Sequence, residues 1–160
     1  MKKFLSFVLT KDIHAMLPTE QVAEILNLPP DQIAPIPDMP PAVLGICNWR
    51  GGILWLLDLA QILDFKPLYA QDWRQQNYRI LILQTKNNIL GVAVNQVGQM
   101  INCEEEQIKR PPGVKNKPLL ANCLKGQWQN PNGKTLLLLD AEALCAIVSN
   151  AKDPSEVLRG

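Results

Sequence analysis

Residues 43–59 read VLGICNWRGGILWLLDL, two apolar runs separated by one cation and a pair of glycines. Apolar runs of this length with glycine punctuation predict buried strands joined by a tight turn. Gly51 and Gly52 tolerate the positive φ that a hairpin loop needs. Arg50 is then held at a strand end, where its guanidinium can meet solvent or a partner. The stretch is therefore expected to provide shape and contact rather than bond-making chemistry.

The composition indicates a globular protein with little net charge. The chain has 160 residues, 47% of them hydrophobic, and a formal net charge of +1. This length suits one domain or two small ones with a substantial core. A chain so close to neutral lacks the basic stripe of a general nucleic-acid binder, and its charge does not favour attachment to membranes.

The N-terminus resembles a signal peptide only in part. The apolar run at residues 4–9 follows two lysines, but Lys11 and Asp12 interrupt it too early. No other stretch approaches the roughly 20 apolar residues of a membrane span. We therefore expect a soluble, cytoplasmic protein.

The sequence assembles neither a metal site nor a catalytic centre, and we expect no cofactor. The single histidine, His14, is expected on the face of a strand. Asp58 and Asp140 each precede a short helical pattern and are expected to cap it, with no nucleophile or base placed beside them. The cysteines form no CxxC pair and are expected to be free, apolar thiols in a reducing compartment. They are Cys47, Cys103, Cys123 and Cys145.

Apolar runs and turn residues predict a mainly β chain with a few short helices. Prolines gathered between Pro29 and Pro41 exclude helix from that part of the first half. The polar residues 151–160 are expected to form a frayed C-terminal tail. Strands are predicted at Phe4–Thr10, Ala15–Pro18, Gly52–Asp58, Tyr78–Thr85, Ile89–Asn95 and Lys134–Asp140, and helices near Thr19–Leu26, Leu59–Leu63 and Ala141–Ser149.

The two halves of the chain show a weak internal repeat. Three dipeptides recur in order at one shared offset, and two further segments align between the halves. In this alignment Leu124-Lys125-Gly126 stands opposite the Asn48–Gly51 core of the opening stretch, which is thus unique to the first half. The aligned pairs are Thr10-Lys11 with Thr85-Lys86, Gln21-Val22 with Gln96-Val97, Gln32-Ile33 with Gln107-Ile108, Leu44…Cys47 with Leu120…Cys123, and Leu54–Asp58 with Leu136–Asp140.

Such a duplication predicts two similar units of short strands. Units of this size with glycine and proline turns favour small barrels, which hide the edges of their sheets. Neither unit alone would bury much surface, so we expect the two to pack on each other. A soft boundary between the two units is expected near residues 66–78, and strands could be exchanged between the units across it.

Together these features resemble the CheW family of chemosensory coupling proteins. Gly45–Gly51 is similar to the family's G-x-x-N-L-R-G motif, Val22–Ile25 to V-x-E-I, and Gly91–Val97 to G-x-x-V-D-x-V. Leu136–Asp140 matches the last strand, and the resemblance extends from Phe4 to about Val148. The sequence departs from the family's pattern in having Trp49 where Leu is usual and Asn95 where Asp is usual, and in a heavier proline stretch.

The resemblance implies a single domain over residues 1–150, made of two packed five-stranded SH3-like β-barrels around a shared apolar interface. It implies a non-catalytic adaptor that couples the cytoplasmic tip of a methyl-accepting receptor to the regulatory domain of a CheA-type histidine kinase. That kinase domain has the same fold. The adaptor is then expected at receptor arrays on the inner membrane. The departures are compatible with a variant that serves phototaxis or type IV pilus motility.

The partner contact is expected where the first half differs from the second. Arg50 is the first candidate, and the alternative is an arginine that pairs internally and orders its turn. The family uses the segment of Val22 and Glu24 near its receptor-facing groove, whereas the alternatives are ordinary core for Val22 and a solvated helical face for Glu24. The partner-binding candidates are Arg50, Trp49, Asn48, Glu24, Val22 and Val97.

Two other classes of function stay open at this point. A generic small-barrel module could bind a peptide or a single-stranded nucleic acid, although the near-neutral charge weighs against nucleic acid. An enzyme would need a catalytic constellation, and the sequence offers none. The duplication favours an adaptor with two faces.

Overall fold

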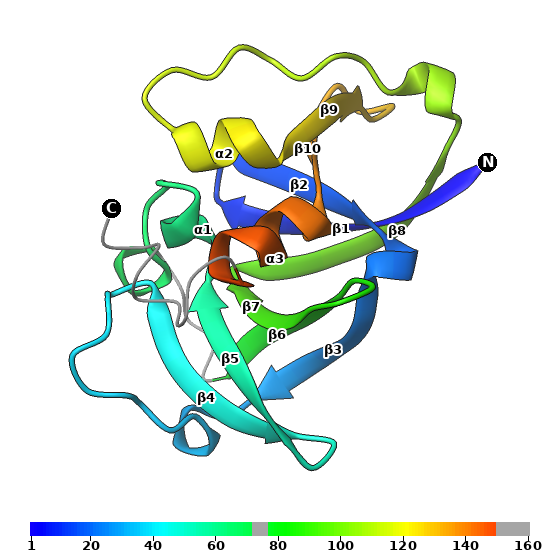
Figure 1. Cartoon of the computed structure of the whole chain (residues 1–160). Coiled ribbons are helices and arrows are strands. Elements are labelled where there is room, and N and C mark those ends of the chain that lie inside the picture. Colours follow the sequence, from blue (N-terminus) through cyan, green and yellow to red (C-terminus); the bar gives the residue numbers. More distant parts are fainter. Residues whose placement is uncertain (72–76, 150–160) are drawn as a thin grey trace.

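The computed structural model describes residues 1–71 and 77–149, and the predicted tail at 151–160 lies outside them. The described part forms two five-stranded sheets with three α-helices, which confirms the predicted mainly β fold (Figure 1). Barrel A is the sheet β8 (Gln96–Cys103), β1 (Lys2–Thr10), β2 (Ile13–Pro18), β10 (Thr135–Leu139) and β9 (Leu124–Gln129), in that order. Barrel B is β3 (Val22–Leu28), β6 (Tyr78–Gln84), β7 (Ile89–Val94), β5 (Gly52–Asp58) and β4 (Val43–Trp49). The helices are α1 (Leu59–Ile62), α2 (Pro118–Cys123) and α3 (Ala141–Ser149).

The two barrels repeat one topology. If β1 to β5 are matched in order with β6 to β10, the strand order of barrel A becomes the order of barrel B. Each barrel also has one parallel pair, β2 with β10 and β7 with β5. Barrel B is built from the consecutive strands β3 to β7, whereas barrel A combines β1 and β2 with β8 to β10, so each half of the repeat contributes strands to both barrels. The strand order thus agrees with the duplication that the recurring dipeptides predicted.

The central strands are apolar on both faces. In β6, Ile80 and Ile82 fill the inside of barrel B, whereas Leu81 and Leu83 face a core shared by both barrels. In β2, Met16 points into barrel A and its neighbours face the shared core. Helix α3 lies between the two sheets and adds Leu144 to the shared core (Figure 1). Continuous apolar runs in the sequence are the consequence of this double burial.

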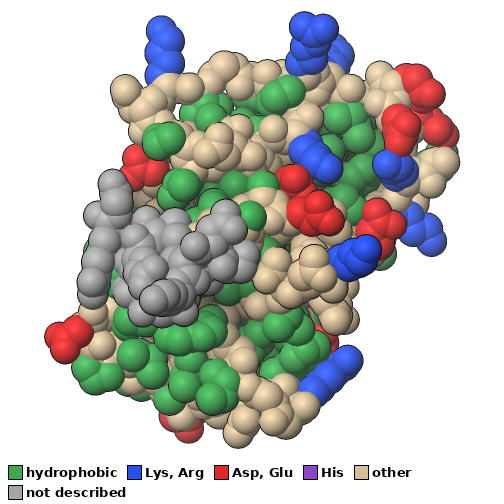
Figure 2. Space-filling view, in the orientation of Figure 1, with side chains coloured by type: hydrophobic (Ala, Val, Ile, Leu, Met, Phe, Trp, Pro, Cys, Tyr) green, Lys and Arg blue, Asp and Glu red, His purple; other side chains and the backbone are tan. Residues whose placement is uncertain are grey.

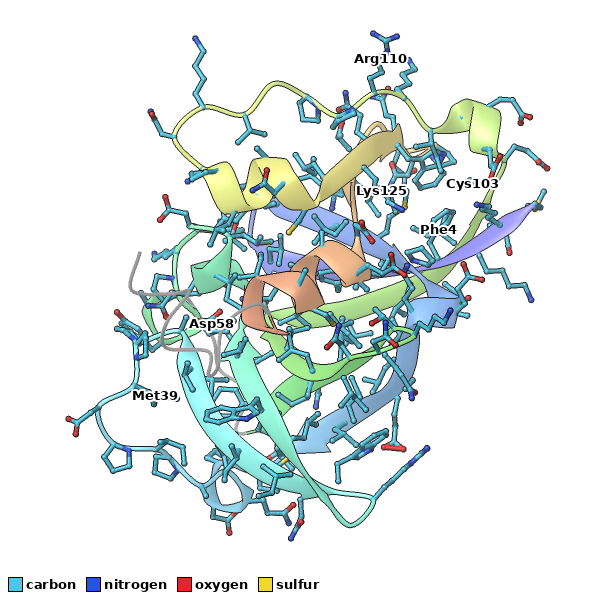
Figure 3. All side chains as sticks on the ribbon, viewed as in Figure 1. Phe4, Met39, Asp58, Cys103, Arg110 and Lys125 are labelled. Atoms are coloured by element: carbon cyan, nitrogen blue, oxygen red, sulfur yellow. The ribbon has the colours of Figure 1, made fainter. Side chains whose placement is uncertain are left out.

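Both predicted aspartate caps are confirmed. Asp58 lies at the end of β5, where the chain turns into α1 (Figure 3), and is only 2% exposed. Its carboxylate accepts from the Gln61 N–H at 3.3 Å and from the Leu68 N–H at 2.8 Å. Burial raises the pKa of this carboxyl, against the effect of the backbone donors. Asp140 directly precedes α3, and its Oδ1 accepts from the Glu142 N–H at 3.1 Å.

The helix predicted near Thr19–Leu26 is wrong. Only Thr19–Gln21 forms a single 3-10 turn, and strand β3 begins at Val22. Exposure alternates along β3, as a strand requires, and β3 pairs antiparallel with β6 from the second half of the chain. The pairing with β6, which is distant in the sequence, therefore determines the structure of this segment, and no local pattern predicts that pairing.

The predicted alignment of Leu44…Cys47 with Leu120…Cys123 is also wrong. The first segment lies on strand β4 and the second on helix α2. The Asp58 N–H donates to the carbonyl of Ala42, and the Asp140 N–H donates to that of Cys123, so Ala42 and Cys123 are equivalent. Helix α2 is therefore an addition of the second half, placed before β9.

The true counterpart of the Arg50 turn is thus the turn at residues 130–133, because Leu124-Lys125-Gly126 belongs to strand β9. Two glycines mark the same equivalence. A Cβ on Gly45 would lie 2.4 Å from the Ala34 carbonyl oxygen, and a Cβ on Gly126 would lie 2.8 Å from that of Lys109. The missing side chain at each glycine leaves room for another backbone segment, which forms an isolated β-bridge to the outer strand that carries the glycine.

Replacing Asp58 by alanine should destabilise the fold by about 2–4 kcal/mol, since it removes a helix cap and leaves the buried Leu68 N–H without its acceptor. Asp140→Ala is the matched control, because the same cap sits in the other half at partial exposure. It should cost about 1 kcal/mol. Urea denaturation measures both losses. Equal losses in the two variants would contradict the role given to the burial of Asp58.

Candidate functional site: the clasp at the tip of barrel B

The turn between β4 and β5 is a two-residue hairpin loop. Trp49 pairs with Gly52, and between them Arg50 has a φ of 49° and Gly51 a φ of 80°. Two successive positive φ values are typical of a type I′ turn, whose twist matches that of the flanking strands. The tight turn predicted from the glycines is confirmed. Arg50 itself occupies the left-handed region, which is uncommon for a residue with a side chain.

Three side chains meet at this turn. The Trp49 indole N–H donates to Oε2 of Glu24 at 3.0 Å. A guanidinium nitrogen of Arg50 lies 3.8 Å from Oε1 of Glu24, and the guanidinium carbon lies 4.6 Å from the centre of the Trp49 ring. We call Glu24, Trp49 and Arg50 the clasp. Because β3 and β4 are the two outer strands of the barrel B sheet, the clasp joins them across the seam of the barrel.

Trp49 contributes most of the free energy that stabilises the clasp. The Arg50 side chain is 66% exposed and that of Glu24 is 38% exposed, so their ion pair contributes at most about 1 kcal/mol. Stacking of Arg50 on the ring adds about 0.5–1 kcal/mol. The partly buried indole bond to a carboxylate is worth about 1–2 kcal/mol. A leucine at position 49, as in the motif that the sequence resembles, could not donate this bond.

The clasp borders a surface of mixed polarity. Asn48 is exposed on β4 and pairs in register with Ile53, which is 69% exposed. Ile25, on the outward face of β3, is 46% exposed. Figure 2 shows hydrophobic side chains gathered over the lower part of the molecule, where β4 and β5 lie. A groove of about 610 Å³ beside the hairpin is lined by Leu28, Gln32, Ala34, Ile46, Cys47, Asn48 and Ile53.

The two remaining candidates, Val22 and Val97, lie at equivalent places in the equivalent strands β3 and β8. Both are partly buried and pack against the shared core. The structure therefore brings Glu24, Trp49 and Arg50 together, leaves Asn48 exposed beside them, and places the two valines against the core. For Arg50, the internal pairing weighed as an alternative is present, although two thirds of its side chain stays exposed.

Among the described residues, the cysteines and the candidate metal ligands decide whether a reactive thiol or an ion site is present. All four cysteines are free and buried, as predicted. Burial raises the pKa of Cys123 to about 12 and that of Cys145 to about 11, so neither thiol is a thiolate near neutral pH. Over residues 1–71 and 77–149, no group of three or more His, Cys, Asp and Glu could hold a metal ion. No helix in the same ranges has the length and apolarity needed to cross a membrane.

The comparisons with known proteins agree with this fold. The family model described as the CheW-like domain matches residues 3–148. Among solved structures, the chain is similar to the scaffolding protein TtCheW from Thermoanaerobacter tengcongensis, with a TM-score of 0.73 and 24% identity over 87% of this chain and 88% of that chain. No functionally curated protein matches the sequence. The predicted fold of two SH3-like barrels is thereby confirmed.

Trp49→Phe keeps a ring but removes the indole donor, and it should lower the free energy of unfolding by about 1–2 kcal/mol. Arg50→Ala should lower it by less than about 1 kcal/mol. Urea denaturation compares the two variants directly. A larger loss from Arg50→Ala would show that the ion pair, rather than the indole bond, holds the clasp.

Glu24→Gln serves as the control for that experiment. Glutamine keeps an oxygen that can accept from the indole but loses the charge that attracts Arg50. Its loss of stability should therefore be smaller than that of Trp49→Phe.

Proposed function

The chain belongs to the CheW-like domain family, and on that premise we propose that it is a non-catalytic adaptor of a chemosensory array. It couples the cytoplasmic tip of a methyl-accepting receptor to the regulatory domain of a CheA-type histidine kinase. The match of the family over nearly the whole chain is the observation that carries the proposal. The adaptor then works in the cytoplasm, recruited to receptors at the inner membrane.

The proposed mechanism is positional. A duplicated fold offers two barrels with different surfaces, so the receptor and the kinase can bind at the same time. Single contacts of this kind are weak, and a ring of such contacts gains avidity because each further contact is intramolecular. Signalling then follows from contacts that differ between two states of the array and so shift the kinase between them.

The clasp and its neighbours are the proposed contact on barrel B. Arg50 and Asn48 supply exposed polar groups beside the apolar Ile53, a mixture typical of protein interfaces. Glu24 and Trp49 hold the guanidinium at the tip of the hairpin, so its orientation is partly fixed before binding.

Val22 and Val97 are the proposed receptor-facing residues. They lie at equivalent positions, Val22 as the first residue of β3 and Val97 as the second residue of β8, and each is only partly buried. A receptor helix that contacts both would touch both halves of the duplicated chain. The proposal needs only the exposed part of each valine, since the rest packs against the shared core.

Co-sedimentation tests the coupling role. Receptor-tip assemblies are pelleted with a CheA-type kinase in the presence and absence of the full chain. The chain should bring the kinase into the pellet, because neither partner is expected to hold the other as firmly without it. If the chain pellets with neither partner, or leaves the amount of pelleted kinase unchanged, the coupling role is contradicted.

Arg50→Ala should weaken the binding of one partner by about thirtyfold, as expected for an interface anchor worth about 2 kcal/mol. The circular dichroism spectrum should stay that of the original protein, because the clasp depends mainly on Trp49. Arg110→Ala is the matched control, since Arg110 is exposed at the end of the molecule away from the hairpin (Figure 3). Unchanged binding of both partners by Arg50→Ala would remove Arg50 from the interface.

A further inference from the structure

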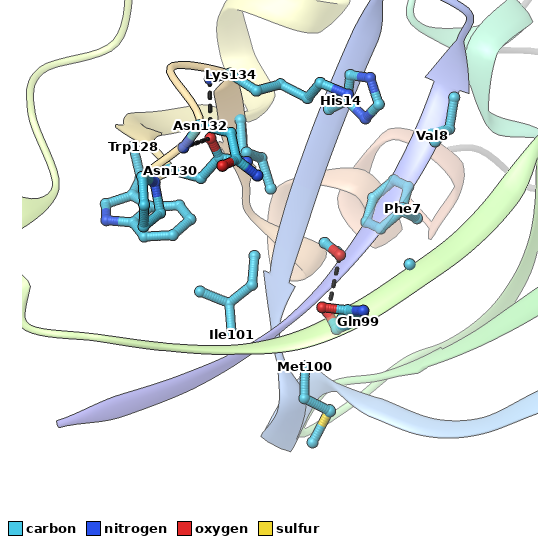
Figure 4. A pocket seen from close by; sticks show the side chains of 14 residues that line it. Phe7, Val8, His14, Gln99, Met100, Ile101, Trp128, Asn130, Asn132 and Lys134 are labelled. Atoms are coloured by element: carbon cyan, nitrogen blue, oxygen red, sulfur yellow. Dashed lines mark hydrogen bonds between the residues drawn. The ribbon is translucent and has the colours of Figure 1, made fainter.

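The seam of barrel A is open where that of barrel B is closed. The recurring dipeptides share one offset between the halves, and the same offset makes Gln99 the equivalent of Glu24. Counting along the chain from the equivalent residues Ala42 and Cys123 makes Asn130 the equivalent of Trp49. Gln99 and Asn130 line a cavity of about 420 Å³ between β8 and the turn that follows β9 (Figure 4). The Oδ1 atom of Asn130 accepts from the N–H groups of Asn132 and Lys134, at 3.0 and 2.9 Å, within its own turn. Barrel A thus replaces the clasp with a hollow.

One end of this hollow is apolar. Ile101 from β8 and Trp128 from β9 line it from its two sides, whereas the side chain of the adjacent Met100 leaves β8 on the opposite side (Figure 4). Ile101 and Trp128 are only partly buried and pack against the same apolar cluster inside barrel A. An apolar side chain of a ligand would therefore find partners here without any change in the core.

The other end is cationic. A second cavity, of about 750 Å³, shares the lining residues Val8, His14 and Lys134 with the first, so the two adjoin. We call the two adjoining cavities the furrow. Among the described residues that line it, the cationic end adds Lys11 and Lys66 to Lys134 and has one carboxylate, that of Asp12. All three lysines are exposed, and none forms an ion pair with another residue in the described part of the chain.

The floor of the cationic end is already held in place. The Gln71 side-chain N–H donates to the carbonyls of Leu9 at 3.0 Å and of Lys66 at 2.7 Å. The Asn95 side-chain N–H donates to the Gln71 amide oxygen at 2.5 Å. These bonds join the turn after α1 to strand β1, so the lysines are carried on a preformed surface.

Strand β8 gives the furrow a backbone edge as well. Within the described residues β8 pairs only with β1, so its outer edge has no strand partner. The β8 residues Gly98, Gln99, Met100 and Ile101 all line the furrow. An extended peptide can pair with such an edge through main-chain hydrogen bonds while its side chains enter the neighbouring hollows.

We propose that the furrow binds an extended acidic peptide segment of a partner protein. Its carboxylates meet Lys11, Lys66 and Lys134, and an apolar side chain lies between Trp128 and Ile101. The complementarity of charge and the open strand edge are the observations that favour a peptide. Three lysines opposed by one aspartate are a small cationic area for a nucleic acid, whose binding depends on a run of phosphate contacts. This inference stands apart from the coupling role and does not depend on the clasp.

Fluorescence anisotropy with the full chain tests the proposal. The probe is a fluorescein-labelled peptide with one leucine followed by six glutamates, at low salt. Lys11→Glu/Lys66→Glu/Lys134→Glu should weaken its binding by about tenfold or more, since three attractions become repulsions. The matched control, Lys3→Glu/Lys109→Glu/Lys115→Glu, reverses three exposed lysines outside the furrow and changes the net charge equally. It should weaken binding by no more than about twofold.

Ile101→Ala separates the apolar end from the charge, and its thermal unfolding verifies that the variant folds. The variant should weaken the binding of the leucine-containing probe severalfold. Its affinity for a probe of six glutamates without the leucine should stay unchanged. Both triple variants replace exposed side chains, and their thermal unfolding verifies that they fold. The proposal is overturned if the peptide does not bind, or if the two triple variants lose affinity equally. It is also overturned if an oligothymidine of matched charge binds more tightly than the peptide and if reversing the charge of the same three lysines abolishes that binding.

Discussion

The core shared by the two barrels is the constraint on which the rest of the structure depends. Strands such as β6 and β2 carry apolar side chains on both faces, one face inside a barrel and the other against the second barrel. Apart from its partner, either barrel would expose one of these faces to water, at roughly 25 cal/mol for each Å² of apolar surface. The topology strengthens the dependence, because each barrel takes strands from both halves of the repeat and neither half completes a barrel from its own strands.

This constraint also limits which surfaces stay free for a contact. Since the broad faces of the central strands are buried, what remains is the seams between outer strands and the turns beside them. The duplicated fold has two such seams, and they have diverged. The indole of Trp49 and the carboxylate of Glu24 close one of them and fix Arg50 at its tip, whereas the other, lined by Gln99 and Asn130, stays open as the furrow. The same position in the duplicated fold thus presents a fixed cation in one barrel and a hollow in the other.

The sequence predicts those parts of the fold that leave a local trace. Burial of both faces of a strand gives a continuous apolar run, so the sequence predicts the strand at Leu54–Asp58 and its counterpart in the second half. The glycines after Arg50 likewise predict a tight turn. Strand β8 is exposed along most of its length and leaves no such run. In β3, the apolar Val22, Ile25 and Leu26 have helical spacing, but the pairing with β6 determines a strand. The bond from Trp49 to Glu24 joins opposite edges of a sheet, and no local pattern predicts it.

The central functional claim is that the hairpin tip of barrel B, held by its clasp, meets a partner. The indole N–H resonance of Trp49 in a two-dimensional N–H spectrum tests it most directly, because this proton lies within the clasp. Receptor-tip helices and the regulatory domain of a CheA-type kinase are added one at a time. The account predicts that one of them shifts the Trp49 resonance in step with binding, while that of Trp55, on the neighbouring strand and packed against the shared core, stays in place. Binding of both partners with the Trp49 resonance unmoved would contradict it.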